Sequence, residues 1–267
     1  MNTITKTAII TALKAGSAIM EIYNSDDFEV EKKADHSPLT KADRVAHDII
    51  VSHLEKTNIP ILSEEGKNIP HEERKNWKQL RIVDPIDGTK EFIKRNGEFT
   101  VNIALIENHK PVLGVIYCPA LNKLYFGDQD GAFKIEEVQE MNFDEQLNRT
   151  VKLPLHTKSD KKITVVASKS HLSPETEDFI HKLKKENDNV RLISKGSSLK
   201  LCMVAEGLAD YYPRFAPTME WDTAAGQAIC EAANCDVIDQ STQKTMLYNR
   251  KELLNNWFLV KSNKLQY

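Results

Sequence analysis

Residues 84–89, Asp-Pro-Ile-Asp-Gly-Thr, combine side chains whose types and spacing suit metal chemistry. Asp84 and Asp87 flank Pro85, which fixes its own φ and lacks an N–H, so we expect the chain to turn there. Both carboxylates could then meet one cation. The glycine that follows permits a close backbone approach, and the threonine can open a helix whose free amides face an anion. The segment therefore predicts a metal and phosphate site; the simpler alternative is an acidic turn that caps a helix.

Further acidic residues could complete a set of metal ligands. Glu64 and Glu65 end a short apolar run. Asp43 falls in the first turn of an expected helix, and Asp222 precedes a run of small residues. Hard oxygen ligands without a His/Cys cluster favour Mg²⁺ over zinc. Each acid also has a structural alternative, either as an exposed residue or as a stabilising charge at a helix N-terminus.

Hydrophobic periodicity divides the chain into two stretches with different patterns. In the first we expect helices at 4–23 and 40–56, strands at 61–63 and 81–83, and a β meander at 99–107, 111–118, 123–127 and 131–136. In the second, strands at 163–167, 190–193, 209–212 and 236–238 alternate with helices at 174–186, 197–206 and 222–233, which favours a layered α/β unit. We predict an α+β protein of two halves packed as one compact unit. Residues 1–155 would carry the metal-binding carboxylates and residues 156–267 the phosphate contacts.

Charge and cysteine content narrow the functional class. Residues 1–150 hold 19 Lys and Arg against 25 Asp and Glu, or -6, whereas residues 151–267 hold 17 against 14, or +3. This asymmetry fits carboxylates that hold cations beside a half that meets a ligand's negative charge, although solvated faces of unequal sign would look the same. The four cysteines form no CxxC pair, so we expect reduced thiols and a cytoplasmic protein. No stretch is apolar enough to span a bilayer, and the sequence leaves peripheral attachment to the inner face of the membrane open.

Three strings, in this order and at these separations, resemble the signature of the inositol monophosphatase superfamily. They are the acidic pair Glu64-Glu65, the segment 84–89, and Trp-Asp-Thr-Ala-Ala at 221–225. The resemblance covers nearly the whole chain. It implies an αβαβα layered sandwich and a Mg²⁺-dependent phosphatase, and it also implies inhibition by Li⁺.

The resemblance assigns roles to individual residues. Two or three Mg²⁺ ions would be held by Glu64, Asp84, the Ile86 carbonyl, Asp87 and Asp222. Thr89 and Asp43, helped by Glu64, would orient the water that attacks phosphorus, and Glu65 would support these ligands from outside. Divalent cations can lower the pKa of that water and clamp both ends of an in-line displacement. Amides near Gly88 and Thr89 would stabilise the phosphoryl oxygens.

The second half is similar to the bisphosphate nucleotidase (CysQ-type) branch. The strings that carry this likeness are Lys-Glu-Phe at 90–92, Ser-Lys-Ser-His at 168–171, Gly-Ser-Ser-Leu-Lys at 196–200 and Tyr-Tyr-Pro-Arg-Phe at 211–215. By resemblance, the substrate would contact Asp87, Gly88, Thr89, His171, Ser197, Lys200, Arg214 and Asp222. The cations would favour the second, uncleaved phosphate of adenosine 3',5'-bisphosphate, which would be cleaved to AMP and phosphate in a step linked to sulfur assimilation. His171 as a surface residue, Ser197 as a plain helix cap and Arg214 in a structural ion pair are the alternatives.

Two other functions compete with this interpretation. One is an inositol monophosphatase or a fructose-1,6-bisphosphatase of the same fold. The sequence features that disfavour it are the residues at 168–171, 197–200 and 214. The other is a non-catalytic ligand-binding or RNA-binding module, which the intact ligand set and the acidic first half disfavour. We therefore expect a small-molecule nucleotide as partner and no nucleic-acid polymer. The sequence leaves the choice between monomer and homodimer open.

Overall fold

The computed structural model describes residues 1–25, 28–32, 38–138, 143–155, 162–168 and 172–263. Its α-helices in these segments are α1 Thr3–Tyr23, α2 Lys41–Leu54, α3 His71–Arg74, α4 Thr89–Ile93, α5 Phe143–Gln146, α6 Pro174–Glu186, α7 Leu199–Glu206 and α8 Glu220–Ala232. Short 3-10 turns lie at Glu55–Thr57, Pro119–Leu121 and Leu147–Arg149. None of the described helices has the length and apolar character needed to cross a membrane.

The larger sheet has seven strands in sequential order. They are β3 Ile61–Ser63, β4 Gln79–Asp87, β5 Thr100–Glu107, β6 Lys110–Cys118, β7 Lys123–Asp128, β8 Gly131–Glu136 and β9 Val151–Lys152. Neighbours are antiparallel except β3 and β4, which run parallel. The expected meander is confirmed by the antiparallel pairing of β5, β6, β7 and β8 in sequence order. Short hairpin connections between consecutive strands favour this pairing.

The smaller sheet has six strands in the order β11-β10-β12-β15-β13-β14. They are β10 Ile163–Ala167, β11 Val190–Ser194, β12 Tyr211–Arg214, β13 Cys235–Asp239, β14 Lys244–Thr245 and β15 Phe258–Ser262. A separate hairpin pairs β1 Glu31–Lys32 with β2 Pro38–Leu39. We propose that the two larger sheets correspond to the two halves predicted from the sequence, with the boundary near residue 155.

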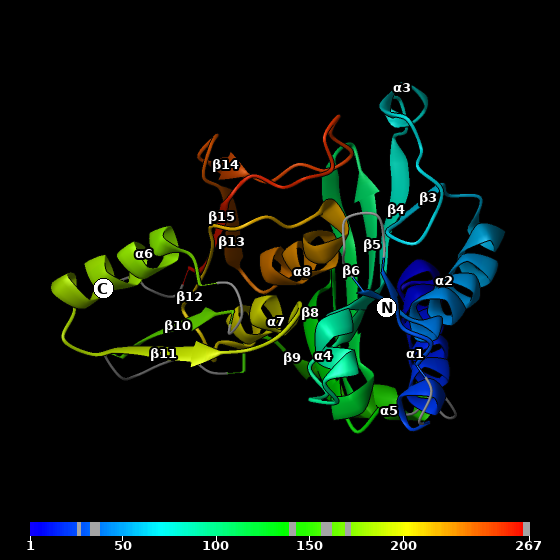
Figure 1. The fold of residues 1–267 in the computed structure, drawn as a ribbon, viewed down its shortest axis with the longest axis horizontal. Coiled ribbons are helices and arrows are strands. Elements are labelled where there is room, and N and C mark those ends of the chain that lie inside the picture. The colour runs from blue at the N-terminus through cyan, green and yellow to red at the C-terminus, as the bar shows by residue number, and fades with distance from the viewer. Residues whose placement is uncertain (26–27, 33–37, 139–142, 156–161, 169–171, 264–267) are drawn as a thin grey trace.

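Five layers stack across the molecule (Figure 1). Helices α1 and α2 cover the outer face of the seven-stranded sheet, and α7 and α8 lie between the two sheets. Helix α6 covers the far face of the six-stranded sheet. The predicted αβαβα sandwich is confirmed.

Small residues let the central helix α8 approach the larger sheet. A Cβ added to Gly114 on β6 would lie 2.0 Å from the Ala225 carbonyl oxygen, and one added to Gly226 would lie 2.5 Å from a Leu201 methyl carbon. The small residues at these contacts therefore allow α8 to pack closely against both β6 and α7. This packing brings Asp222 next to the ends of the sheet strands.

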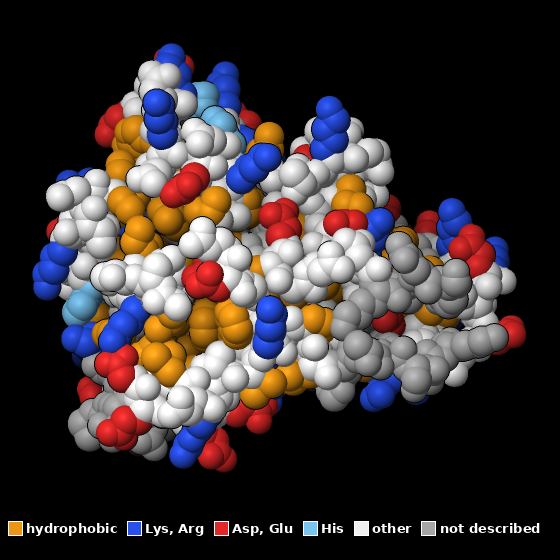
Figure 2. Space-filling view, turned by 180° about the vertical axis from the view of Figure 1, so that it is seen from behind, with side chains coloured by type: hydrophobic (Ala, Val, Ile, Leu, Met, Phe, Trp, Pro, Cys, Tyr) orange, Lys and Arg blue, Asp and Glu red, His pale blue; other side chains and the backbone are white. Residues whose placement is uncertain are grey.

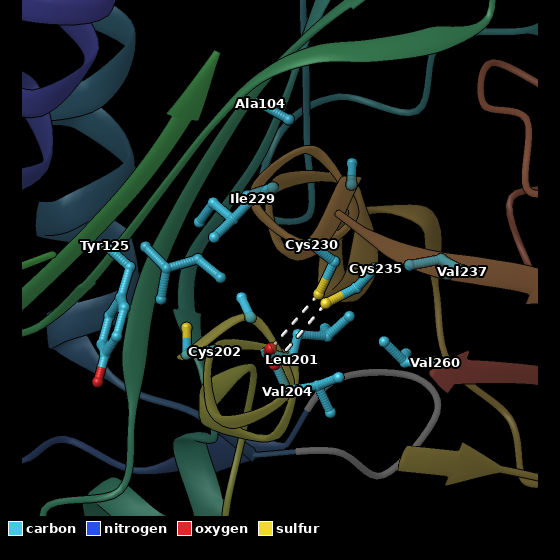
Figure 3. Packing of buried hydrophobic residues seen from close by; sticks show 14 of the residues in the cluster. Ala104, Tyr125, Leu201, Cys202, Val204, Ile229, Cys230, Cys235, Val237 and Val260 are labelled. Carbon is cyan, nitrogen blue, oxygen red and sulfur yellow. Dashed lines mark hydrogen bonds between the residues drawn. The ribbon is translucent and has the colours of Figure 1, made fainter. Parts of the chain in front are cut away.

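The cysteines belong to the core between the two sheets. Figure 3 shows Cys230 and Cys235 packed against α7, where their thiols donate to the carbonyls of Leu201 (3.4 Å) and Val204 (3.7 Å). All four cysteines are buried, and none of them forms a disulfide in the structure.

The surface carries mixed charge. Figure 2 shows the reverse face, where the described Lys and Arg side chains are scattered among Asp and Glu with apolar side chains between them. On this face the described residues form no single basic patch. A polyanion-binding surface would gather its cations instead.

The structure corrects several boundaries. β4 does not end at Val83 but continues through Pro85 to Asp87, and the pairing with β5 shifts register between Asp84 and Asp87. The proline therefore produces an irregularity within an extended strand instead of a turn. β12 spans 211–214 rather than 209–212, and the sequence analysis missed β15, which lies in the middle of the smaller sheet.

Candidate metal centre and substrate pocket

The parallel pairing of β3 and β4 sets two of the predicted acids at one edge of the sheet. Ser63 is paired with Val83, so Glu64 and Asp84 follow at the same level, and the Glu64 N–H donates to the Val83 carbonyl (3.1 Å). The carboxyl ends of parallel strands meet at a common edge of the sheet. Glu64 and Asp84 therefore lie close together although they are twenty residues apart in the sequence. The register shift after Asp84 then brings Asp87 to the same place.

Asp222 joins these residues from the other half of the chain. It is the third residue of α8, and its Oδ2 accepts the Met219 N–H (2.8 Å), as in a capping box. Ligand atoms of Asp84, Asp87 and Asp222 lie within 4.8 Å of one another. Three carboxylates from β4 and α8 thus converge at one point.

The electrostatics of this cluster fit a divalent cation. Asp84 Oδ1 is buried and accepts no hydrogen bond from the described residues. Burial raises the pKa of Asp84 well above its ordinary value, as do the charges of Glu64 and Asp87, and burial followed by the charge of Asp87 raises the pKa of Asp222 to about 8. Gathered and buried negative charge of this kind is unfavourable, and a hard cation with oxygen ligands relieves it.

Asp43 and Thr89 are brought together as predicted. The Thr89 hydroxyl lies 3.2 Å from Asp43 Oδ1 and 3.3 Å from the Ile86 carbonyl oxygen, both of which can accept its hydrogen. The other carboxylate oxygen of Asp43 accepts from the N–H (2.7 Å) and hydroxyl (2.5 Å) of Thr40, the N-cap residue of α2. Asp43 is buried, and its two oxygens have separate partners. Its position at the start of the helix and its contact with Thr89 are therefore compatible.

Glu64 and Glu65 act electrostatically on different residues. The charge of Glu64 raises the pKa of both Asp84 and Asp222, which places it beside them, although it is outside the group of three mutually close ligands. Glu65 acts electrostatically on Arg44 of α2. The ligand role of Glu64 and the supporting role of Glu65 stay predictions.

One pocket runs from the carboxylates to the predicted phosphate contacts. Its lining includes Asp87, Gly88, Ser197, Lys200, Arg214 and Asp222, together with Lys90, Ser168 and Tyr212, which were not assigned roles. The sequence prediction for these six residues is therefore consistent with a common cavity between the halves. His171 lies outside the described residues.

Lys200, which is buried, and Arg214, which is half-buried, shape the far side of the pocket. The Lys200 ammonium donates to the carbonyls of Ser197 (2.6 Å) and Lys195 (3.4 Å) and lies 5.5 Å from the Tyr212 ring centroid. Burial lowers the pKa of Lys200 to about 8; the charge of Asp87 opposes this shift and that of Arg214 adds to it. Arg214 donates from Nη2 to the Pro217 carbonyl (3.0 Å), while its buried Nε has no partner among the described residues.

The loop that carries Ser197 is held by a residue the sequence analysis did not single out. Glu98 Oε2 accepts the Gly196 N–H (2.7 Å), and Oε1 pairs with Lys195 (3.0 Å). Ser197 follows at φ 42°, a left-handed conformation that costs energy for a residue with a side chain. Ser197 is therefore not a plain N-cap, because α7 begins two residues later at Leu199.

Comparisons with known proteins agree with this geometry. The family model described as Inositol monophosphatase family matches residues 1–266. The 3'(2'),5'-bisphosphate nucleotidase CysQ of Salmonella typhimurium (strain LT2) is 45% identical over 254 residues, covering 93% of this chain and 96% of that protein. Its counterpart in Escherichia coli (strain K12) is 43% identical over 253 residues, with the same coverage.

A solved structure is similar over almost the full length. The crystal structure of CysQ from Bacteroides thetaiotaomicron, described as a bacterial member of the inositol monophosphatase family, aligns with a TM-score of 0.89 and 51% identity. The alignment covers 97% of each chain. Together with the match across residues 1–266, this shows that the chain belongs to the inositol monophosphatase family.

Proposed function

We propose that this chain is a Mg²⁺-dependent 3'(2'),5'-bisphosphate nucleotidase that hydrolyses the 3'-phosphate of adenosine 3',5'-bisphosphate to give AMP and phosphate. The observation that carries the proposal is the single pocket lined at one end by Asp87 and Asp222 and at the other by Lys200 and Arg214. A metal-held phosphate beside two cations suits a substrate with two phosphate groups. Relatives at 43–45% identity that carry this name support it.

The ligand set would consist of Asp84, Asp87 and Asp222 with Glu64 and the Ile86 carbonyl. Bound Mg²⁺ supplies positive charge that lowers the pKa of water and stabilises the phosphoryl oxygens as charge builds on them. The number of ions, two or three, is part of the proposal.

Thr89 and Asp43 would act on the attacking water. Asp43 accepts the hydroxyl hydrogen of Thr89 (3.2 Å), which leaves the lone pairs of that hydroxyl free to accept a hydrogen bond from water. Asp43 is itself fixed by two donors from Thr40. The pair therefore holds its geometry before substrate arrives, as efficient general acid–base catalysis requires.

Lys200 and Arg214 would hold the phosphate that is not cleaved. Lys200 is buried, and the buried Nε of Arg214 has no hydrogen-bond partner among the described residues, so it needs an acceptor. A phosphate group supplies several anionic oxygens to such donors. Ser197 and, as a prediction on a residue outside the described segments, His171 would complete the contacts.

The second candidate function is a sugar phosphatase, which would hydrolyse a phosphate ester with the same metal centre. Structures named as inositol monophosphatases share the fold at 20–24% identity, which says nothing about the substrate. Nothing in the metal centre selects the leaving group, so the choice depends on the two cations.

We also propose a reducing compartment, the cytoplasm, because the four buried cysteines form no disulfide.

The test is phosphate release with Mg²⁺ from adenosine 3',5'-bisphosphate, inositol 1-phosphate and fructose 1,6-bisphosphate. We expect kcat/KM for the nucleotide to exceed the others by about a hundredfold, or about 2.7 kcal/mol of transition-state discrimination. A preference for a sugar phosphate would refute the nucleotidase and leave the metal centre intact. Loss of all activity with EDTA, restored by Mg²⁺, is the accompanying control.

A further inference from the structure

The Ser198 hydroxyl lies where the two halves of the chain meet inside the metal centre. It precedes α7 and is buried. Its Oγ lies 2.6 Å from Asp87 Oδ2, 3.0 Å from the Asp222 carbonyl oxygen and 2.9 Å from Asn102 Nδ2. One side chain of the second half therefore touches groups from β4, β5 and α8.

The neighbouring donors fix the direction of the Ser198 hydrogen. Thr100 donates to Asn102 Oδ1 (3.0 Å), which leaves the Asn102 amide N–H to donate to Ser198 Oγ (2.9 Å). Ser198 has one hydrogen, and the groups left to receive it are the Asp87 carboxylate and the Asp222 carbonyl. The carboxylate contact is shorter and charge-assisted, so it takes the hydrogen.

We propose that Ser198 is a positioning residue that orients the Asp87 carboxylate for metal binding, and that Asn102 acts through it by holding its hydroxyl. The inference rests on the metal centre of the proposed function but not on the identity of its substrate. Asp87 Oδ2 accepts the Ser198 hydrogen, and this bond restricts rotation of the carboxylate while leaving its other lone pairs available to a metal. Thr100, Asn102 and Ser198 are all nearly fully buried, so this chain of hydrogen bonds is protected from competing water.

This arrangement also links metal binding to the joining of the two halves. Ser198 belongs to the segment after Gly196, which Glu98 holds against the first half. Partners of this kind, which hydrogen-bond a metal ligand from outside, typically change metal affinity by about 10–100-fold when removed. In this role Ser198 acts through Asp87, although it also lines the pocket.

The experiment measures metal binding without substrate. Mn²⁺ would be titrated into the full-length protein and free Mn²⁺ followed by electron paramagnetic resonance, for the parent, Ser198→Ala, Asn102→Ala and the double variant. We expect Ser198→Ala to weaken Mn²⁺ binding at least about tenfold. Asn102→Ala should have a smaller effect, and adding it to Ser198→Ala should cost nothing further, since Asn102 acts through Ser198.

A matched control separates positioning from loss of fold. Thr5→Val removes a buried hydroxyl that also donates to a carboxylate at 2.6 Å, that of Asp128, away from the metal centre. It should leave the Mn²⁺ dissociation constant within twofold of the parent. Mn²⁺ affinity in Ser198→Ala equal to that of Thr5→Val, or additive losses in the double variant, would overturn the inference. Because no substrate is present, failure of the nucleotidase assay cannot produce either result.

Discussion

Single residues in this protein owe their chemistry to what surrounds them. Asp84 and Asp222 are ordinary carboxylates that burial and like charges make unfavourable unless a cation is near. Lys200 is a buried ammonium held by backbone carbonyls, which position it but do not neutralise it. Each such group is costly for folding and useful for binding, which is why strongly shifted pKa values gather at functional sites.

Asp87→Asn should remove nearly all turnover while the fold is kept. The substitution preserves volume but removes one negative charge from the three-carboxylate cluster. We expect kcat to fall at least about a thousandfold, or about 4 kcal/mol, with an unchanged far-UV circular dichroism spectrum. Activity within severalfold of the parent would contradict the ligand assignment.

Lys200 predicts how activity depends on pH. Burial lowers the pKa of its ammonium to about 8, so the positive charge is present below that pH and lost above it. We expect kcat/KM for the bisphosphate to decline as pH rises through about 8. Lys200→Arg is the control, because a guanidinium stays charged and the decline should disappear. An identical decline in both proteins would assign it to another group.

Lys200→Ala tests the second phosphate separately. KM should rise more for adenosine 3',5'-bisphosphate than for nucleotides with one phosphate, because the lost charge faces the group that only the former carries. Equal rises for both substrates would contradict the role of Lys200.

At the scale of secondary-structure elements, pairing of strands and docking of loops decide the site. The parallel register of β3 and β4 aligns Glu64 with Asp84, and the register shift in β4 adds Asp87. The second half contributes through two helix starts, those of α7 and α8. Glu98, just before β5, joins the two contributions by holding the loop at Lys195 and Gly196.

Glu98→Gln should loosen that loop and weaken substrate binding. It removes the ion pair with Lys195 and leaves only a neutral acceptor for the Gly196 N–H (2.7 Å). We expect KM for the bisphosphate to rise about tenfold, or about 1.4 kcal/mol, with Mn²⁺ affinity unchanged. Glu72→Gln breaks the exposed pair with Lys75 and should alter neither quantity. A KM effect shared by both variants would show that the loop contact is irrelevant.

At the scale of the whole molecule, the acidic centre links stability to pH and metal. The folded-state pKa of Asp222, about 8, exceeds its ordinary value of 3.8, and that of Asp84 is raised too. Between these pH values the folded state binds more protons than the unfolded state, so metal-free stability falls as pH rises from about 4 to about 8. Metal should reverse this loss where the carboxylates are ionised.

The measurement is the melting temperature with EDTA or with Mg²⁺ at pH 5 and pH 8. Mg²⁺ at a hundred times its Kd stabilises by about 2.7 kcal/mol, and we expect the larger shift at pH 8. The chain with Asp87→Asn serves as the control and should show little shift at either pH. Equal shifts at both pH values in the parent would contradict the linkage.

The sequence by itself was enough to predict a metal site, because most of the predicted ligands lie in short contiguous segments. Residues 84–89 hold two predicted ligands, a hydroxyl and Gly88, and their types and spacing can be read from six consecutive residues. Local helix signals located α1, α2 and α6 to within two residues, and the turn residues between the strands located the meander. These features depend on neighbours along the chain, and short-range patterns predict them.

Only the tertiary structure decided which residues meet across the halves. Asn102 and Ser198 are separated by 96 residues, and no local pattern marks either as a partner of Asp87. β15 was missed because its role as a central strand depends on pairing with β12 and β13, not on its own composition. Pro85 was expected to turn the chain, yet pairing with β5 keeps the segment extended. Long-range pairing and burial are properties of the folded chain, and they determined how the ligands, the two cations and Ser198 come together.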